Sequence, residues 1–485
     1  MELAFIPVYI KYLGIEAYGL IGIFALLQAW LTLLDMGMTP TLIREMARFT
    51  GGAHSAQAIR DLLRSIEIIA FGMAISVALG IWAASGWLAS DWLIAEKLPV
   101  DTVAKAFAVM GVIIALRFIE NIYRSSIVGL QKQVLLNIIN SFTATLRGIG
   151  AVGIFIWMSS TIEAFFLWQG VISVLNLVLF ALIVYRTLPM VDHGGRFSRP
   201  ALQDIWHFSS GMVVITFLSL LITQMDKILL SHILTLKVFG YYVFAGVVAS
   251  GLNILSTAIA DAYFPDFVKI LSHKDEIALR RSYHQGAQLV IVVVGAAAFV
   301  LMLFADRMLL LWTGDPIFTQ QVTPIAIVLV FGTFIHCLLV IPYQMQLAYG
   351  WTSITIRVNT VAIAIFVPAN VLIVPIYGVM GAAWLWVVLN VGCFIFGMNY
   401  MYRRILTTEK WIWYRDDVLF PMVVAAAATL VCRWMLPVQL SLVGELLVLV
   451  SSYVATIALS SLAAPLIRKS LFDFVRKLNK QRSRI

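Results

Sequence analysis

The chain has 485 residues, of which 61% are hydrophobic and only 12% are charged. Soluble domains are about 45–50% apolar and about 25% charged. A soluble fold of this length could not hide so much apolar surface, because a large exterior always remains to be covered. Basic residues outnumber acidic ones by 34 to 25, and the three cysteines lie in apolar segments, so no disulfide framework is indicated. The composition therefore predicts a membrane protein.

Thirteen apolar runs are long enough to cross a bilayer, which takes about 20 residues. A further apolar segment, residues 1–13, is too short, and we interpret it as the distal end of a first helix. The loops are too short to hold a folded domain, which excludes enzymes that need a soluble catalytic module. The runs lie at about 18–38, 66–88, 104–127, 134–157, 163–185, 209–233, 238–262, 288–311, 322–347, 354–375, 380–400, 418–436 and 442–464.

The placement of Lys and Arg predicts the orientation of these spans. Alternating the segments between the two sides of the membrane puts 25 basic residues on one side and six on the other, with Arg117, Arg147 and Lys227 left within spans. The basic side, which includes the tail 465–485, is expected to be cytoplasmic. The excess of basic residues is then explained by topology and by lipid headgroups, so we expect membrane lipids as partners and no nucleic acid.

The sequence recurs at an offset of 221 residues, which relates Gly19 to Gly240 and Arg60 to Arg281 at equivalent places in turns and basic segments. Six helices fit within the offset, so the two copies have the same orientation, as in transporters with parallel repeats. We expect an all-α polytopic protein with about 14 transmembrane helices, the first one truncated. The predicted domains are an N-terminal six-helix lobe at 1–190, a C-terminal six-helix lobe at 191–405, and a terminal helix pair with its basic tail at 406–485.

Two arginines are expected at similar depth in the membrane. Arg117 and Arg147 lie near the middles of adjacent runs, about 20 and 25 Å from the turn that joins them. A charge at a helix centre costs about 2.5–3.5 kcal/mol, so such residues indicate function. Glu120 shares a helix face with Arg117 and could form a structural ion pair with it. The excess of arginine instead favours a hydrated cavity that binds an anion, because guanidinium groups bind phosphate with two hydrogen bonds.

Four further ionisable residues are candidates, and three of them have a structural alternative. Asp226 and Lys227 are predicted to join the substrate-binding group, although Lys227 could extend to the membrane interface instead. Asp35 ends a span, where a carboxylate commonly caps a turn, and a coupling or gating role is the alternative. His336 lies in the middle of a span and could carry a coupling proton or be a core histidine.

Sequence motifs of catalysis are absent. The chain has no G-x-x-x-x-G-K-[ST], so we do not expect it to hydrolyse ATP. It also has no H-E-x-x-H, no metal-binding Cys/His spacing and no G-x-S-x-G. We expect no catalytic residues, no metal site and no cofactor.

Four regions carry a recognisable pattern: PVYIKYLGIEAYGL (7–20), LLDMGMTPTLIREMAR (33–48), TQMDKILLSHIL with FGYY (223–234 and 239–242), and AYFPDFVK (262–269). They resemble the polysaccharide-biosynthesis flippases, the O-antigen type of translocase in the multidrug/oligosaccharidyl-lipid/polysaccharide (MOP) exporter superfamily. The resemblance implies 14 helices in two six-helix lobes plus a terminal pair. It also implies movement of an undecaprenyl-diphosphate-linked oligosaccharide from the cytoplasmic to the periplasmic leaflet of a bacterial inner membrane. The first helix of the family is full length, whereas we expect residues 1–13 to be only the end of such a helix.

The leading hypothesis is therefore a lipid-linked oligosaccharide flippase of the inner membrane that works by alternating access, with no enzymatic activity. Arg117 and Arg147, together with Lys227, would bind the diphosphate, and Glu120 would hold Arg117 and exchange partners when the anion binds. Polysaccharide polymerase machinery is a candidate partner. One alternative is a multidrug exporter of the same superfamily driven by H⁺ or Na⁺, which would call for an acidic cavity. Another is a polytopic polysaccharide polymerase or ligase, which would need a substantial outer loop.

Overall fold

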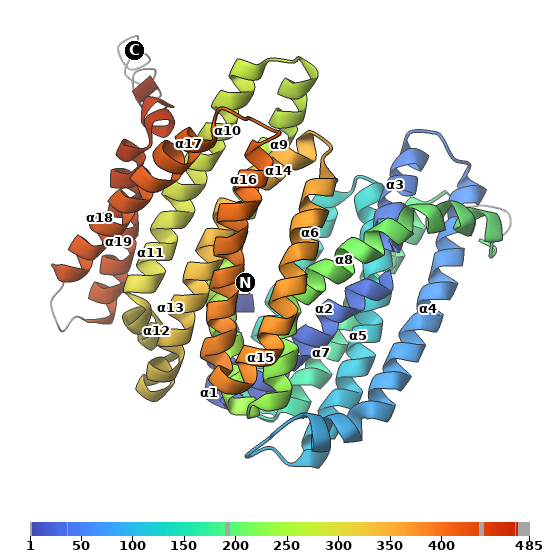
Figure 1. Cartoon of the computed structure of the whole chain (residues 1–485). Helices are drawn as coiled ribbons and strands as arrows, with labels where there is room; N and C mark the ends of the chain where they lie inside the picture. Colours follow the sequence, from blue (N-terminus) through green and yellow to red (C-terminus); the bar gives the residue numbers. More distant parts are fainter. Residues whose placement is uncertain (1, 36, 190–194, 436–440, 471, 474–485) are drawn as a thin grey trace, which may run out of the picture. The chain divides into compact units, whose positions relative to one another are not determined.

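A computed structural model describes residues 2–35, 37–189, 195–435, 441–470 and 472–473, nearly all of them in helices (Figure 1). Among these residues, the β structure is limited to an isolated bridge between Ile94 and Thr235. The chain divides into two compact units, Met1–Gly240 (unit 1) and Tyr241–Ile485 (unit 2). The predicted all-α fold class is confirmed.

Unit 1 consists of long helices joined by short turns. The elements are α1 Glu2–Leu13, α2 Ile15–Leu31, η1 Thr32–Asp35, α3 Met38–Thr50, α4 Ala56–Trp87, η2 Leu88–Trp92, α5 Val100–Gly129, α6 Gln133–Trp157, α7 Ile162–Thr187, α8 Arg199–Ile233 and the first residues of α9 Leu236–Ser272.

Unit 2 holds the rest of α9 and more interrupted helices. These are α10 Glu276–Val290, η3 Ile291–Gly295, α11 Ala296–Leu303, α12 Ala305–Thr313, α13 Pro316–Leu338, α14 Val340–Ala348, α15 Thr352–Gly392, η4 Cys393–Gly397, α16 Met398–Tyr402, α17 Lys410–Ile412, η5 Trp413–Leu419, α18 Phe420–Trp434 and α19 Leu442–Ala463.

Eleven helical segments of the described residues are long and apolar enough to cross a membrane, so the chain is a multi-pass membrane protein. One of them, Ile356–Tyr402, covers the predicted run 380–400 and all but the first two residues of the run 354–375. Gly378 separates these runs, because its positive φ of 56° breaks the helical path of α15. The count of about 14 spans stays a prediction.

The predicted domain boundaries near residues 190 and 405 also stay predictions. Units 1 and 2 are the two parts of the chain whose residues mainly contact one another. The predicted lobes instead follow the repeat of six helices in the sequence, so the two divisions need not coincide. Most of the predicted basic tail, residues 474–485, lies outside the described residues.

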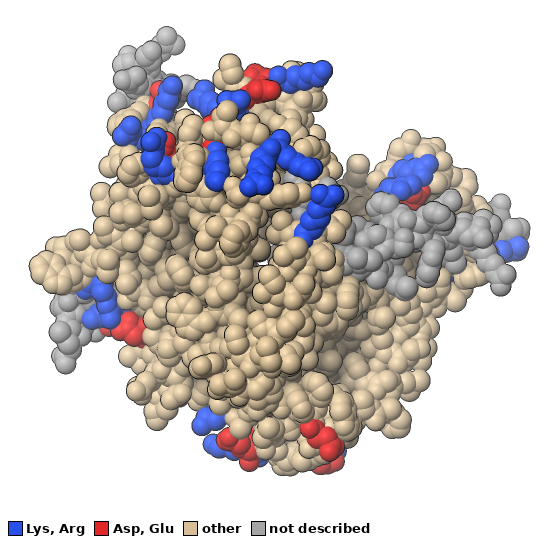
Figure 2. Space-filling view, viewed as in Figure 1, with Lys and Arg blue, Asp and Glu red and all other residues tan. Residues whose placement is uncertain are grey.

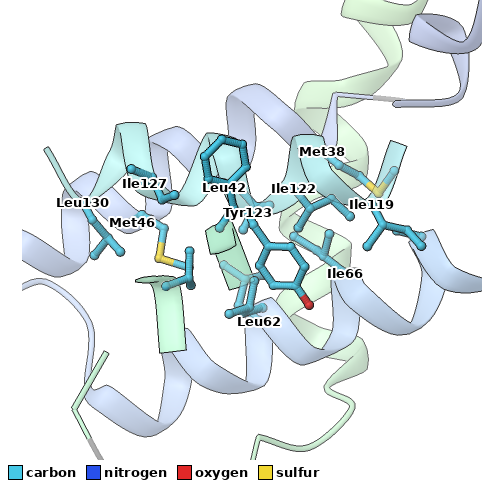
Figure 3. Packing of buried hydrophobic residues seen from close by; sticks show 14 of the residues in the cluster. Met38, Leu42, Met46, Leu62, Ile66, Ile119, Ile122, Tyr123, Ile127 and Leu130 are labelled. Atoms are coloured by element: carbon cyan, nitrogen blue, oxygen red, sulfur yellow. The ribbon is translucent and has the colours of Figure 1, made fainter. Parts of the chain in front are cut away.

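The core of unit 1 lies where α3, α4, α5 and α7 meet. Met38, Leu42 and Met46 recur every four residues, so they form one apolar face of α3. This face packs against the side of α5 that carries Ile119 and Ile122 (Figure 3). Glu120 and Asn121 lie between these two isoleucines, and their side chains point in other directions from α5. They therefore line a different surface of this helix.

The start of α2 and the start of α9 approach each other closely at two glycines. A Cβ on Gly19 would collide with the carbonyl oxygen of Leu236, and a Cβ on Gly240 would lie 2.6 Å from the carbonyl oxygen of Ile15. Any side chain at either position would therefore push the two helices apart. The 221-residue offset turns one contact into the other, because it relates Ile15 to Leu236 and Gly19 to Gly240.

Candidate functional site

Unit 1 contains a cavity of about 630 Å³ whose wall is built by α2, η1, α3, α5, α6, α7 and α8. Arg117 and Arg147 lie in the middle of α5 and α6, about 18 and 21 Å along these helices from the turn between them. The structure thus brings both predicted arginines to one cavity, about midway along two helices that are long and apolar enough to cross a membrane. The charged residues that line it are Arg117, Arg124, Arg147, Asp35 and Glu120, three cations and two anions.

Several neutral groups orient Arg117. Its guanidinium donates hydrogen bonds to Oε1 of Gln28 at 2.7 Å and to Oε1 of Gln169 at 3.3 Å. It also lies 5.0 Å from the centre of the Phe24 ring, where the face of an aromatic ring attracts a cation. These partners fix the direction of the guanidinium, and none of them carries a negative charge.

Glu120 lies among the cations of the cavity. The charges of Arg117, Arg147 and Arg124 all act on it, and the amide of Asn176 hydrogen-bonds its carboxylate. Its Oε2 atom is buried and has no hydrogen-bond partner among the described residues. Together with Asp35, it provides two carboxylates for the three guanidinium groups among the described residues that line the cavity, so the cavity combines structural counterions with an excess of positive charge.

Asp35 has the capping role that the sequence offered as the structural alternative. Its carboxylate accepts hydrogen bonds from the backbone N–H of Thr39 at 3.2 Å and from the Thr39 hydroxyl at 2.6 Å. The amide of Asn121 in turn donates to the same hydroxyl at 2.9 Å. This chain of bonds joins the first turn of α3 to α5 at the cavity wall. A gating role for Asp35 stays a prediction.

Three predicted residues are not among the described residues that line the cavity. Lys227, on α8, donates to the backbone oxygen of Thr223 at 2.8 Å and lies 4.0 Å from Asp226. His336 belongs to unit 2, where its Nδ1 lies 3.1 Å from Oδ1 of Asn390. Substrate binding by Asp226 and Lys227, and proton coupling by His336, stay predictions.

Comparison with known proteins identifies the family. Residues 11–316, more than half of the chain, match the family described as polysaccharide biosynthesis protein. The chain belongs to this family. A relative from Shigella flexneri, named "Putative O-antigen transporter", is 22% identical over 382 residues, which cover 77% of this chain and 87% of the relative.

Two solved structures share the fold of this chain. An inward-facing multidrug resistance MATE family transporter of the MOP superfamily has a TM-score of 0.67 at 13% identity, with 83% of this chain and 94% of that chain covered. The lipid II flippase MurJ in an inward closed conformation also has a TM-score of 0.67, at 11% identity, with 94% and 95% covered. The resemblance to MOP superfamily transporters is confirmed at the level of the fold.

Unit 2 holds a second buried polar cluster, which the sequence did not predict. His284 of α10 hydrogen-bonds Asp417 through Nδ1 and lies 3.1 Å from Glu409 through Nε2. Gln288, one turn further along α10, donates to Asp417 at 2.8 Å and accepts from the backbone N–H of Leu466 at 2.9 Å. The cluster thereby ties α10 to the terminal helix pair.

The partners of Glu409 make it a stable anion. Burial raises the pKa of Glu409, but hydrogen bonds from Thr408 and His284 and the charge of Arg280 outweigh burial, so its pKa lies below the ordinary 4.5. Arg280 donates to it at 2.8 Å. Arg280, His284 and Gln288 are spaced by four residues, which puts them on one face of α10. That spacing is the sequence signal that could have indicated the cluster.

A third buried carboxylate, Glu67 of α4, is also held by its neighbours. It accepts hydrogen bonds from the hydroxyls of Tyr123 at 2.9 Å and Tyr185 at 2.6 Å, and from Arg64 at 3.2 Å. These contacts join α4, α5 and α7 beside the apolar core of unit 1. Nothing in its local sequence distinguishes Glu67 from an exposed helical glutamate, because its partners come from distant parts of the chain.

Proposed function

We propose that this protein is a flippase that moves an undecaprenyl-diphosphate-linked oligosaccharide from the cytoplasmic to the periplasmic leaflet of a bacterial inner membrane by alternating access. Three comparisons support the proposal: membership of the polysaccharide biosynthesis family, a relative named as an O-antigen transporter, and a fold shared with a lipid II flippase. The oligosaccharide unit of a surface polysaccharide is the proposed cargo.

The observation that carries the proposal is the cationic cavity of unit 1. Its 630 Å³ lies within the range of about 300–1,000 Å³ that small-molecule sites occupy. Arginine suits a diphosphate because its planar donors match two phosphate oxygens at once. A charge-assisted hydrogen bond contributes about 1.5–3 kcal/mol, so Arg117 and Arg147 together could hold a dianionic group away from water while the lipid tail stays in the bilayer.

Glu120 gives the site a way to release its ligand. When the diphosphate enters, it competes with Glu120 for the same guanidinium groups. When the diphosphate leaves, the carboxylate again compensates them, so the empty cavity does not keep three cations uncompensated at membrane depth. Glu120 and the diphosphate thus exchange places around Arg117 and Arg147 on binding and release. A carrier needs such an exchange, because otherwise it would not release its substrate.

The distribution of charge in unit 2 supports the proposed orientation. Lys and Arg gather at the end of the unit that carries α10, α16 and α17 (Figure 2). The opposite end holds Arg307 and Arg433, each beside an acidic residue, Glu445 and Asp306. Positive residues accumulate on the cytoplasmic side of membrane proteins. We propose that the end with α10 and α17, and the C-terminus that follows α19, are cytoplasmic.

The test is complementation of a bacterial strain that lacks its own O-antigen flippase. The unaltered chain should restore surface polysaccharide, whereas Arg117→Ala and Arg147→Ala should restore less than about a tenth of it, since each loses a charge-assisted contact. Arg415→Ala is the matched control, because Arg415 is an exposed arginine paired with Asp416. All variants should reach the membrane in equal amounts.

Two results would overturn the proposal. Full surface polysaccharide from the Arg117→Ala, Arg147→Ala double variant would remove the cavity from the mechanism. Failure of the unaltered chain to restore polysaccharide, combined with resistance to cationic dyes in the same cells, would instead favour a multidrug exporter driven by H⁺ or Na⁺. The excess of arginine in the cavity argues against that alternative, because an organic cation calls for an acidic site.

A further inference from the structure

Unit 2 carries a long apolar groove that the transport proposal does not use. It has a volume of about 690 Å³ and lies between the two halves of α15 and along η4. Most of its wall is aliphatic or aromatic, and several of these side chains are exposed, for example Val361, Ile365 and Phe396 at 61%, 67% and 74%. Its polar groups are at one end, where Arg357 and Tyr400 meet.

The length of the groove matches one leaflet of a bilayer. Its lining on the first half of α15 runs from Arg357 to Ala369, which is about 18 Å at the rise of an α-helix. The hydrocarbon core of a bilayer is about 30 Å thick, so one leaflet accounts for about 15 Å. A groove of this length with a charge at one end has the dimensions of an extended acyl chain below a headgroup.

The polar end is built to receive an anion. Nη1 of Arg357 donates to the Tyr400 hydroxyl at 3.0 Å, a bond that uses one of the five guanidinium N–H donors. The guanidinium of Arg404 lies 5.7 Å from the centre of the Tyr400 ring and 5.8 Å from that of Trp351. Two guanidinium groups thus flank Tyr400, which lines the groove together with Arg357, beside aromatic rings typical of the membrane interface.

We propose that this groove binds an anionic phospholipid, whose phosphate pairs with Arg357 and whose acyl chain lies between the two halves of α15. The charge of the polar end selects the phosphate, and the apolar wall selects the chain. Phosphatidylglycerol is a lipid with both properties. The site is separate from the cavity of unit 1, and the proposal does not depend on the transport function.

Gly392 and Gly397, which have no side chain, leave space for the acyl chain. A Cβ on Gly392 would meet no atom within 4 Å, and a Cβ on Gly397 would lie 3.6 Å from the nearest atom, on Val358. A large residue at 392 can therefore fill the groove without disturbing the packing of the helices. Gly80 of α4 is the matched control, because a Cβ there also meets no atom within 4 Å, and it lies in unit 1, outside the groove.

The experiment is native mass spectrometry of the purified full-length protein, equilibrated with detergent micelles that contain equal amounts of phosphatidylglycerol and phosphatidylcholine. The unaltered protein and Gly80→Leu should each retain one tightly held phosphatidylglycerol. Gly392→Leu should lose this lipid because its chain path is blocked. Arg357→Ala should retain about tenfold less phosphatidylglycerol and no longer distinguish it from phosphatidylcholine. Thermal unfolding midpoints close to that of the unaltered protein would show that both variants are folded.

Three results would overturn the proposal. One is equal retention of phosphatidylglycerol by the unaltered protein, Gly392→Leu and Arg357→Ala. Another is displacement of the lipid by millimolar inorganic phosphate, since an acyl chain in the groove should make the lipid bind far more tightly than its headgroup alone. The third is preferential, Arg357-dependent retention of a polyprenyl phosphate when it is added in equal amount, which would identify a different occupant.

Discussion

Unit 1 and unit 2 each hold a buried cluster of charged residues, and their surroundings differ. In unit 2, His284 uses both ring nitrogens, and both carboxylate oxygens of Asp417 and of Glu409 have a partner. The side chains of His284 and Asp417 are only 9% and 1% exposed. In unit 1, three guanidinium groups face a cavity of 630 Å³, and Oε2 of Glu120 lacks a partner among the described residues.

The difference separates a structural network from a binding site. Buried polar groups are usually fully hydrogen-bonded, and a complete network makes the structure around it rigid. The cluster of unit 2 fits this description and fastens the terminal helices to α10. An incomplete network beside open space leaves bonding capacity for a ligand, which describes the cavity of unit 1. The predictions below test whether the two clusters respond to substitution in these different ways.

The largest effect is expected in unit 2. Asp417→Ala removes the partner of His284 and Gln288 in a buried place, so it should lower the free energy of unfolding by about 3–5 kcal/mol. The midpoint of thermal unfolding of the purified protein measures this. Asp416→Ala is the control, since Asp416 pairs with the exposed Arg415 and such surface pairs contribute at most about 1 kcal/mol. Equal midpoints for the two variants would contradict the structural role.

Arg147→Ala should affect binding far more than stability. Loss of a charge-assisted hydrogen bond of about 1.5–3 kcal/mol predicts affinity for an isoprenoid diphosphate that is about 10- to 100-fold weaker. Titration of the detergent-purified protein with farnesyl diphosphate measures this. The unfolding midpoint should fall less than in Asp417→Ala. Unchanged affinity, with a large loss of stability, would make Arg147 a structural residue like those of unit 2.

Glu120→Gln should strengthen anion binding. The substitution keeps the shape of the side chain and removes a negative charge that competes with the ligand, so we expect affinity for farnesyl diphosphate to rise about tenfold. Release should become slower, so surface polysaccharide in the complementation assay should fall although binding improves. Glu163→Gln, at the start of α7, serves as the control. Weaker binding in Glu120→Gln would show that Glu120 holds the arginines in place rather than competing with the ligand.

The smallest effect concerns Glu409 and depends on pH. The pKa of Glu409 lies below the ordinary 4.5. The ionised carboxylate therefore stabilises the folded state at pH values above 4.5, and this contribution is lost as the pH falls through the pKa of the folded state. At pH 7, the free energy of unfolding of Glu409→Gln should therefore be about 1 kcal/mol lower than that of the unaltered protein. The midpoint of thermal unfolding measures this difference. This difference in free energy of unfolding between the two proteins should narrow below pH 4.5. A difference that stays constant from pH 7 to pH 4 would mean that the charge of Glu409 does not contribute to stability.

Much of the candidate site could be predicted from residues close together in the sequence. Arg117 and Arg147 were expected at similar depth because helices rise by a constant amount per residue and a short turn joins α5 to α6. The role of Asp35 in capping was an expected alternative because its partner, Thr39, is four residues away. Lys227 was expected beside the arginines, but the described residues that line the cavity do not include it.

The sequence by itself determined that the chain crosses a membrane many times, where its long apolar runs lie, and to which family it belongs. These properties depend on composition, helical length and local motifs. Only the tertiary structure decided that Gln28 and Gln169, on two other helices, orient Arg117, and that His284 meets Asp417 across 133 positions of the chain. Such contacts depend on how each helix is rotated about its axis and which helix lies beside it. Hydropathy carries little information on either, because in a bilayer the outward and inward faces of a helix are both apolar.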